Sequence, residues 1–243
     1  NYGLRINTAL VKDLQKSALR RIVVGEVAGN PQYASLLWPY FPLGISENRH
    51  PITKNINPVK FEFPTAIDTL GRRGIKTEVL FESSKLTNVK SLPNYVELNE
   101  IQNLDSLTIM ERPSTPKIFA VALQGEFTSA YANRSERNEF PNFISKSKNN
   151  KMIVISDGDV ARNAVLKGEP LPLGEDLLTN QRYGNEQFLS NALDYLLDDD
   201  NLISLRSRSI ENRLLDRRRI DDERTFWQWF NLLLPLGIIA GLG

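Results

Sequence analysis

Two carboxylates flank a glycine in the segment Ser156-Asp157-Gly158-Asp159, directly after an apolar run at residues 152–155. In open α/β sheets, ligands bind at the carboxyl ends of strands and near helix N-termini. Asp157 and Asp159 could therefore hold a cation or position a polar ligand. The alternative is an ordinary turn in which one aspartate caps the following helix. The residue spacing of a calcium-binding loop is absent, which favours the turn and predicts no metal site.

A second strand-then-turn position is Gly125-Glu126, which follows the apolar run at residues 118–123. Glu126 with Asp157 or Asp159 would suit a hydrolase or lyase acting on an envelope polysaccharide or peptide. That chemistry needs the carboxylates to converge in one cleft, roughly 5–10 Å apart. No spacing in the sequence ties Glu126 to a second carboxylate or to a histidine, so a general acid/base pair is unsupported.

Other catalytic patterns are missing from the chain. The single histidine, His50, precedes a proline, and no Gly-x-Ser-x-Gly nucleophile elbow accompanies it. The phosphate-binding pattern Gly-x-x-x-x-Gly-Lys-Ser/Thr is absent, so the chain is not itself an ATPase subunit. There are no cysteines, which removes thiolate nucleophiles, disulfides and sulfur-based zinc sites. We expect a protein that is not an enzyme and has no cofactor.

Aromatic and proline residues gather around Trp38 and Tyr40, in a stretch that reads as a long loop. Exposed aromatic side chains often anchor protein interfaces, so this loop is a candidate partner contact. Packing of the same rings onto their own domain explains the pattern equally well.

Strands and helices alternate in the interior pattern. Apolar runs with β-branched residues predict strands at residues 22–27, 76–81, 118–123 and 152–155. Helical spacing predicts helices at about residues 8–19, 65–70, 160–166 and 186–197. This alternation predicts an α/β layered domain with a mostly parallel sheet.

Composition excludes one class of partner and the C-terminal residues suggest another. The formal net charge is only +1, so we expect no nucleic-acid binding. Residues 226–243 are almost wholly apolar and begin with a cluster of tryptophan and phenylalanine, as a membrane helix does at the lipid headgroups. The alternatives are a buried core helix or an amphipathic helix lying on a partner. The charges at residues 217–225 are mixed in sign and do not define an orientation.

Several longer motifs occur in a characteristic order: YGLRIN (residues 2–7), VGEVAGNPQ (24–32), WPYFPL (38–43), HPIT (50–53), LQGEFTSAYANR (123–134), VISDGDVARN (154–163), PLPLGED (170–176) and the segment at 183–216. Together with the closing apolar segment, this series resembles GldG, the family of gliding-motility-associated ABC transporter components. The resemblance covers nearly the whole chain. Family members have an upstream membrane span and the first part of the α/β domain, which this chain lacks.

The resemblance implies a Rossmann-like or flavodoxin-like α/β domain at residues 1–216, a charged juxtamembrane linker at 217–225 and the start of a transmembrane helix at 226–243. It also implies a subunit of the cell inner membrane whose soluble domain faces the periplasm. ABC permease and ATPase subunits and the cytoplasmic membrane are the partners implied. No catalytic residues transfer from the family. The candidate ligand or partner contacts remain Gly125, Glu126, Asp157, Gly158, Asp159, Trp38 and Tyr40.

Overall fold

The computed structural model describes residues 2–47, 50–98, 113–135 and 139–198, all of which belong to one compact unit, Asn1–Ser207. The longer strands are β1 (Leu4–Asp13), β2 (Ser17–Val27), β3 (Asn30–Gly44), β5 (Thr65–Thr69), β6 (Ile75–Glu82), β7 (Thr87–Ser91), β8 (Ile118–Thr128) and β9 (Lys146–Ile155). Two-residue strands are β4 (Val59–Lys60), β10 (Val165–Leu166), β11 (Glu169–Pro170), β12 (Glu175–Asp176) and β13 (Gln181–Arg182). The helical elements described are the short 3-10 helices η1 (Pro51–Thr53) and η3 (Asp159–Ala161) and the α-helix α3 (Asn185–Leu197).

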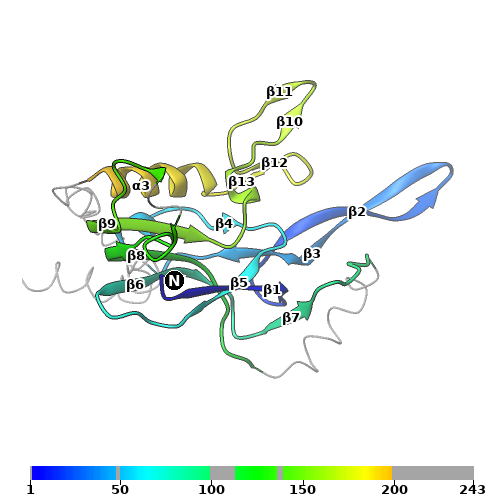
Figure 1. The fold of residues 1–243 in the computed structure, drawn as a ribbon. Helices are drawn as coiled ribbons and strands as arrows, with labels where there is room; N and C mark the ends of the chain where they lie inside the picture. The colour runs from blue at the N-terminus through cyan, green and yellow to red at the C-terminus, as the bar shows by residue number, and fades with distance from the viewer. Residues whose placement is uncertain (1, 48–49, 99–112, 136–138, 199–243) are drawn as a thin grey trace, which may run out of the picture. The chain divides into compact units, whose positions relative to one another are not determined.

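The strands form antiparallel sheets, and the predicted mostly parallel, Rossmann-like or flavodoxin-like sheet is wrong. Six strands form one sheet in the order β6-β8-β5-β1-β7, with β9 also paired to β8. β2, β3 and β4 form a second sheet, and β10–β11 and β12–β13 are separate hairpins (Figure 1). Every strand pairing in the described part of the chain is antiparallel.

Connection lengths explain the antiparallel arrangement. A parallel pair needs a crossover of about a dozen residues or more, whereas an antiparallel pair closes through a two-residue turn. β2 and β3 are joined by Ala28 and Gly29 alone, and both residues have positive φ, at 53° and 80°. Positive φ at both central residues is the geometry of the tight hairpin turn that matches the strand twist. Only residues 14–16 separate β1 from β2.

The predicted strands are confirmed as parts of β2, β6, β8 and β9, and the predicted helix at residues 186–197 is confirmed as α3. The other predicted helices are wrong. Residues 8–19 form β1, a turn and the start of β2, because Asp13 Oδ1 accepts the backbone N–H groups of Gln15 and Lys16 and stops the first strand. Residues 65–70 carry β5, and residues 160–166 are divided between η3 and β10.

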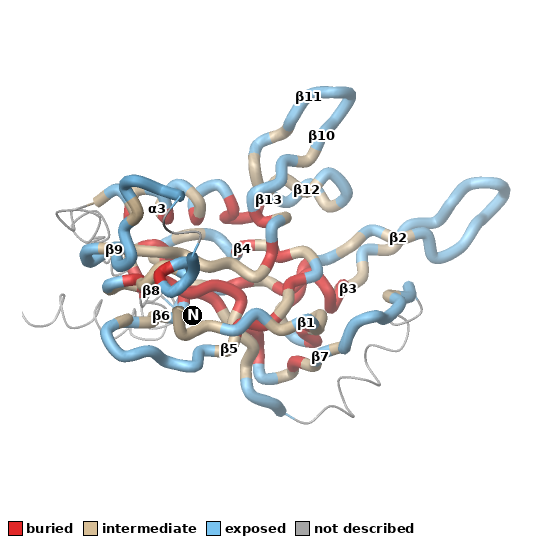
Figure 2. Tube along the Cα trace, in the orientation of Figure 1, coloured by how far each residue is buried: buried red, intermediate tan, exposed pale blue. Residues whose placement is uncertain are grey.

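The main apolar core lies against α3 and includes residues of η1, β1, β4, β5, β6 and β8 (Figure 2). Its members with 0% exposure are Val11, Ile52, Val59, Phe61, Phe119, Ala120 and Phe188. Gly44 in β3 allows a close approach there, because a Cβ at this position would lie 2.7 Å from the ring of Phe61. A smaller cluster joins β2 and β3 to Tyr183 through Ala18, Trp38, Tyr40 and Phe41.

The outer part of the β2–β3 hairpin, residues 22–35, extends away from both clusters; we call it the arm. Figures 1 and 2 show the arm as a two-stranded ribbon that is exposed over most of its length. The register shifts between Val23 and Gly25, so β2 carries a bulge at Val24.

No helix in the described ranges is long and apolar enough to span a lipid bilayer. The predicted membrane segment, residues 226–243, and the predicted linker, residues 217–225, both lie outside the described residues.

Candidate functional site: a charged cavity at the base of the arm

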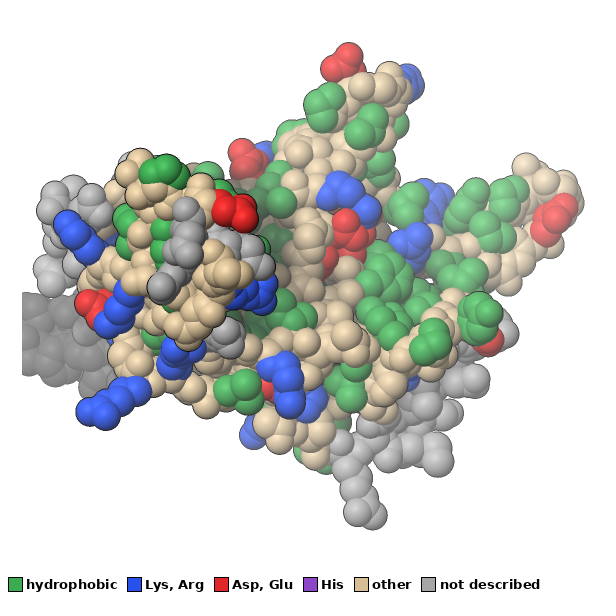
Figure 3. All heavy atoms as spheres, in the orientation of Figure 1, with side chains coloured by type: hydrophobic (Ala, Val, Ile, Leu, Met, Phe, Trp, Pro, Cys, Tyr) green, Lys and Arg blue, Asp and Glu red, His purple; other side chains and the backbone are tan. Residues whose placement is uncertain are grey.

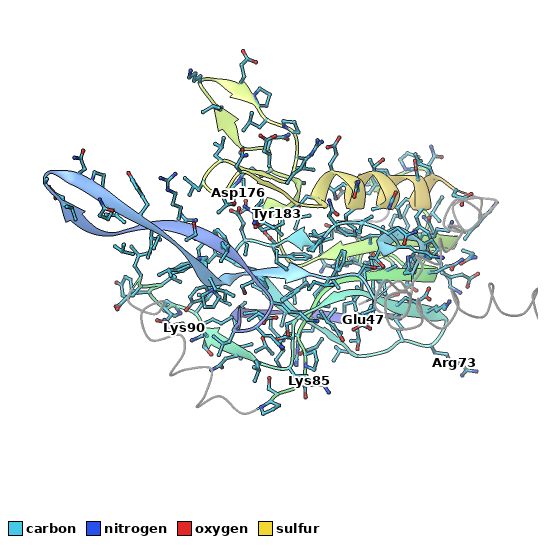
Figure 4. All side chains as sticks on the ribbon, turned by 180° about the vertical axis from the view of Figure 1, so that it is seen from behind. Glu47, Arg73, Lys85, Lys90, Asp176 and Tyr183 are labelled. Carbon is cyan, nitrogen blue, oxygen red and sulfur yellow. The ribbon has the colours of Figure 1, made fainter. Side chains whose placement is uncertain are left out.

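A cavity of about 170 Å³ lies at the base of the arm. Its walls come from β2, β3, β4, the segment after η3, and the β12–β13 hairpin. Figure 4 shows the labelled Asp176 and Tyr183 beside each other, between the arm and α3. The arrangement brings together charged side chains that are far apart in sequence.

Lys60 is the central cation of this cavity, and its side chain is only 12% exposed. Its Nζ atom lies 2.8 Å from Glu62 Oε1 and 2.9 Å from Asp176 Oδ2. The same atom lies 5.5 Å from the ring centroids of Phe41 and of Tyr183. Burial by itself lowers the pKa of Lys60, but hydrogen bonds and charge attraction to the two carboxylates outweigh it and raise the pKa above its ordinary value. Lys60 is therefore charged and held in place.

A second cation, Arg162, extends the network toward the loop predicted from the sequence. Its Nη2 atom lies 2.8 Å from Glu62 Oε2, and its Nη1 atom lies 3.0 Å from Asp159 Oδ1. The ion pairs thus form a continuous chain in which Asp176, Lys60, Glu62, Arg162 and Asp159 alternate in sign. Burial tends to raise the pKa of Asp176, but Lys60 and two backbone N–H groups lower it overall.

Asp157 is buried behind this chain and holds its backbone together. Its Oδ2 accepts the N–H of Glu62 at 2.6 Å, and its Oδ1 accepts the N–H of Asp159 at 2.8 Å. Burial raises the pKa of Asp157 to about 6, the charges of Asp159 and Glu62 add to the rise, and the two N–H bonds oppose it. Gly158 lies in the same turn with an ordinary negative φ of −77°. Asp157 thus joins the end of β9 to the segment that follows β4.

The structure places Gly125 and Glu126 elsewhere. The N–H of Ser156 donates to the carbonyl of Phe119, so the Asp157 turn lies beside the start of β8. Glu126 is seven residues further along β8, which at about 3.3 Å per residue corresponds to roughly 23 Å. Its exposed carboxylate pairs with Lys146. The converging carboxylates that the hydrolase or lyase alternative requires are therefore not formed.

Gly125 has a structural reason for being glycine. Its φ is 152°, and a Cβ would lie 2.2 Å from the carbonyl oxygen of Gly74. That distance is far inside van der Waals contact, so β6 and β8 can meet here only without a side chain.

Trp38 and Tyr40 belong to β3 rather than to a loop. Their side chains are buried, with 4% and 0% exposure, and the ring centroids lie 5.5 Å apart. The structure thus places both rings inside the domain's own smaller core, which was the second interpretation left open by the sequence.

A second hollow, of about 530 Å³, lies beside α3. It is mainly polar, with lining side chains that include Asn57, Arg182, Glu186, Gln187 and Asn191. Arg182 and Glu186 already pair with each other at 2.6 Å. Binding pockets for small molecules are mostly apolar with a few polar groups, so this hollow is a weaker candidate than its size suggests.

A family model described as an ABC-type uncharacterized transport system matches residues 1–192. The chain belongs to this family. It is an auxiliary component of an ABC-type transport system, which implies permease and ATPase partners in general. No curated protein and no solved structure matches the chain.

For this auxiliary component, the structure adds site residues that the sequence patterns did not suggest: Arg20, Lys60, Glu62, Arg162 and Asp176. The sequence did contain one indication that Lys60 and Glu62 lie together. They alternate with apolar residues in the run VKFEF, so they fall on the same side of an extended chain. Asp176 is 116 residues away from Lys60, and no local pattern connects them.

The charged side chains that line this cavity largely pair with one another. The cavity is smaller than the roughly 300–1,000 Å³ of a typical ligand pocket. The ammonium of Lys60 and the guanidinium of Arg162 are both held by carboxylates, so neither is poised to transfer a proton. No group of three or more His, Asp or Glu side chains suited to a metal ion occurs among the described residues. The ion-pair chain instead fixes the relative positions of β4, η3 and the β12–β13 hairpin.

Proposed function

We propose that this auxiliary component is a binding or coupling subunit that stands outside the cytoplasmic membrane and works with the permease and ATPase of an ABC transporter linked to gliding motility. The family match over residues 1–192 carries the proposal. The absence of a phosphate-binding ATPase pattern from the sequence agrees with an accessory role. The apolar residues 226–243 support an anchor in the inner membrane.

The site geometry supports binding over catalysis. Glu126 is far from Asp157, and the cavity's Lys60 and Arg162 are neutralised by ion pairs within the domain. A rigid charged surface of this kind positions elements against a partner, since its side chains lose little further freedom on binding.

A pull-down from native envelope membranes tests the subunit assignment. The tagged chain, with residues 226–243 intact, is extracted in mild detergent, and the bound proteins are identified by mass spectrometry. We expect an ABC ATPase and its permease to be recovered together. Recovery of neither, with cleavage of envelope glycans or peptides by the purified domain, would replace the proposal with an enzyme.

Two further measurements test the location. Removal of residues 226–243 is expected to move the chain from the membrane fraction to the soluble fraction. Protease added to spheroplasts is expected to digest the domain while a cytoplasmic control protein survives. Digestion only after lysis would show that the domain faces the cytoplasm. Spreading of a deletion strain on agar tests the link to gliding, which unchanged spreading would refute.

A further inference from the structure

The β2–β3 ribbon from Leu19 and Leu37 outward, which includes the arm, has one covered face and one open face. The register pairs Arg20 with Leu36 and Ile22 with Ala34 on one face. Leu36 and Ile22 pack against the smaller aromatic cluster, so this face is covered at the base of the arm.

The other face carries Leu19, Arg21, Val23, Tyr33 and Leu37, which the register places opposite or diagonal to one another. Leu19, Val23 and Tyr33 are 38%, 58% and 51% exposed. Figure 3 shows hydrophobic side chains gathered along the arm and at its base. We call this apolar row the open face.

Both edges of the arm disfavour pairing with a further strand. The bulge at Val24 disrupts the outer edge of β2, and Pro31 lacks an N–H on β3. Bulges and edge prolines are the devices by which sheets prevent strand addition. A partner must therefore cover the open face with side chains rather than extend the sheet.

The open face also carries a positive charge in a defined position. The guanidinium carbon of Arg21 lies 4.3 Å from the ring centroid of Tyr33. Stacking on the ring orients the guanidinium while its N–H groups can still bind an acceptor. The complementary surface is apolar with a carboxylate at its edge.

The area of the open face distinguishes between possible occupants. The open face presents four apolar side chains and Arg21, against roughly 20–30 residues per partner in a standard interface of about 800 Å² a side. Two copies held only by their open faces would thus form a weak dimer. A surface of this size suits a subunit that is already held in a larger assembly.

We propose that the open face of the arm docks in an apolar groove, edged by a carboxylate, on the permease subunit of the same transporter. This inference rests on the proposed function, because it takes the permease as a partner. The contact is assigned to the arm. The candidate contact residues predicted from the sequence, such as Trp38, Glu126 and Asp157, lie outside it.

Site-specific photo-crosslinking in native membranes tests the contact. A photoreactive residue is placed at Val23 on the open face or, as a matched control, at Leu193 of α3, which is 60% exposed. We expect an adduct with the permease from position 23 and none from position 193. Adducts only with lipid, with a second copy, or equally from both positions would overturn the inference.

Two variants give a quantitative readout in the pull-down. Val23→Asp and Arg21→Glu are expected to lower permease recovery about tenfold, while Leu193→Asp leaves it unchanged. Thermal unfolding serves as the folding check, because Val23 is exposed and its replacement should leave the melting temperature unchanged. Full recovery with both arm variants would overturn the docking inference while the subunit assignment stands. Failure to recover the permease with the unaltered chain would overturn both.

Discussion

The carboxyl group of Asp157 is buried and accepts two backbone N–H groups while lying close to the charges of Glu62 and Asp159. Burial raises its pKa to about 6 from an ordinary value of 3.8. The folded protein therefore retains a proton that the unfolded chain releases. The stability that this proton contributes is fully present below pH 3.8 and is lost as the pH rises through about 6.

We expect the free energy of unfolding of the wild-type protein, relative to Asp157→Asn, to fall by on the order of 2–3 kcal/mol between pH 4 and pH 7. Urea unfolding of both proteins across this range measures the difference. Comparison with the variant cancels the contribution of His50, whose pKa is lowered by burial and which affects stability in the opposite direction. Glu126→Gln, at an exposed site, serves as the control. Parallel profiles for wild type and Asp157→Asn would contradict the expectation.

At this scale, the sequence identified part of the candidate site. Asp157 and Asp159 were visible because carboxylates directly follow an apolar run. Lys60 and Asp176 were not, because only the antiparallel fold brings β4 to the β12–β13 hairpin. Trp38 and Tyr40 were recognised as unusual, but the sequence could not decide between burial and exposure for a run of aromatics.

Among the elements, β1 and β6 are each followed by a turn. The buried carboxylate of Asp13 accepts hydrogen bonds from both turns. Asp13 Oδ1 accepts the N–H groups of Gln15 and Lys16 and the hydroxyl of Ser84, and its Oδ2 accepts the N–H of Ser84. Asp13 is fully buried, so no water can replace it for these donors.

Asp13→Ala is expected to destabilise the domain by about 2–4 kcal/mol, because several buried donors lose their acceptor at once. Chemical denaturation measures this loss. Asp68→Ala removes an exposed carboxylate that pairs with Arg5 and should cost under about 1 kcal/mol. Equal losses in the two variants would show that Asp13 does not connect these turns energetically.

Gly44 and Gly25 provide a matched pair of substitutions in the β2–β3 hairpin. A methyl group at Gly44 would lie 2.7 Å from Phe61 and 2.8 Å from Phe81, whereas nothing lies within 4 Å at Gly25. We expect Gly44→Ala to cost about 1–3 kcal/mol through overpacking, and Gly25→Ala to be neutral or slightly stabilising. Thermal unfolding distinguishes them, and a stable Gly44→Ala would contradict the tight packing there.

The sequence predicted four of the eight longer strands but not their direction. Apolar β-branched runs at residues 76–81 and 118–123 marked β6 and β8, because such side chains suit a buried pleated surface. Periodicity carries no information about parallel or antiparallel pairing. The two-residue connection at Ala28-Gly29 does indicate the direction, because a turn this short can join only antiparallel strands. The wrong helix at residues 8–19 arose because three apolar residues at spacings of four outweighed the turn-forming Asp13.

For the molecule as a whole, the part of the arm beyond the Ile22–Ala34 pair is separate from both apolar clusters. None of the side chains at residues 23–33 belongs to either cluster. Ile22 pairs with Ala34, so the hairpin can be closed at that pair by a shorter turn.

Replacement of residues 23–33 by Asn-Gly is expected to leave the melting temperature within a few degrees of the wild type, since surface changes away from the core have small effects. Circular dichroism during heating measures this. A large fall in melting temperature would show that the arm helps to hold the domain together. The same variant should lose the permease contact proposed above.

The length of the arm has an electrostatic consequence. Six residues from Ile22 to Val27 at about 3.3 Å each place the turn about 20 Å from Ile22, which itself lies two residues beyond the cavity-lining Arg20. The Debye length at physiological ionic strength is about 8 Å, so the field of the cavity's ion-pair chain is largely screened at the turn. Whatever the turn meets responds to the local charge of Glu26 and to apolar contact. The charges of the ion-pair chain and the charge of Glu26 near the turn therefore act independently of each other.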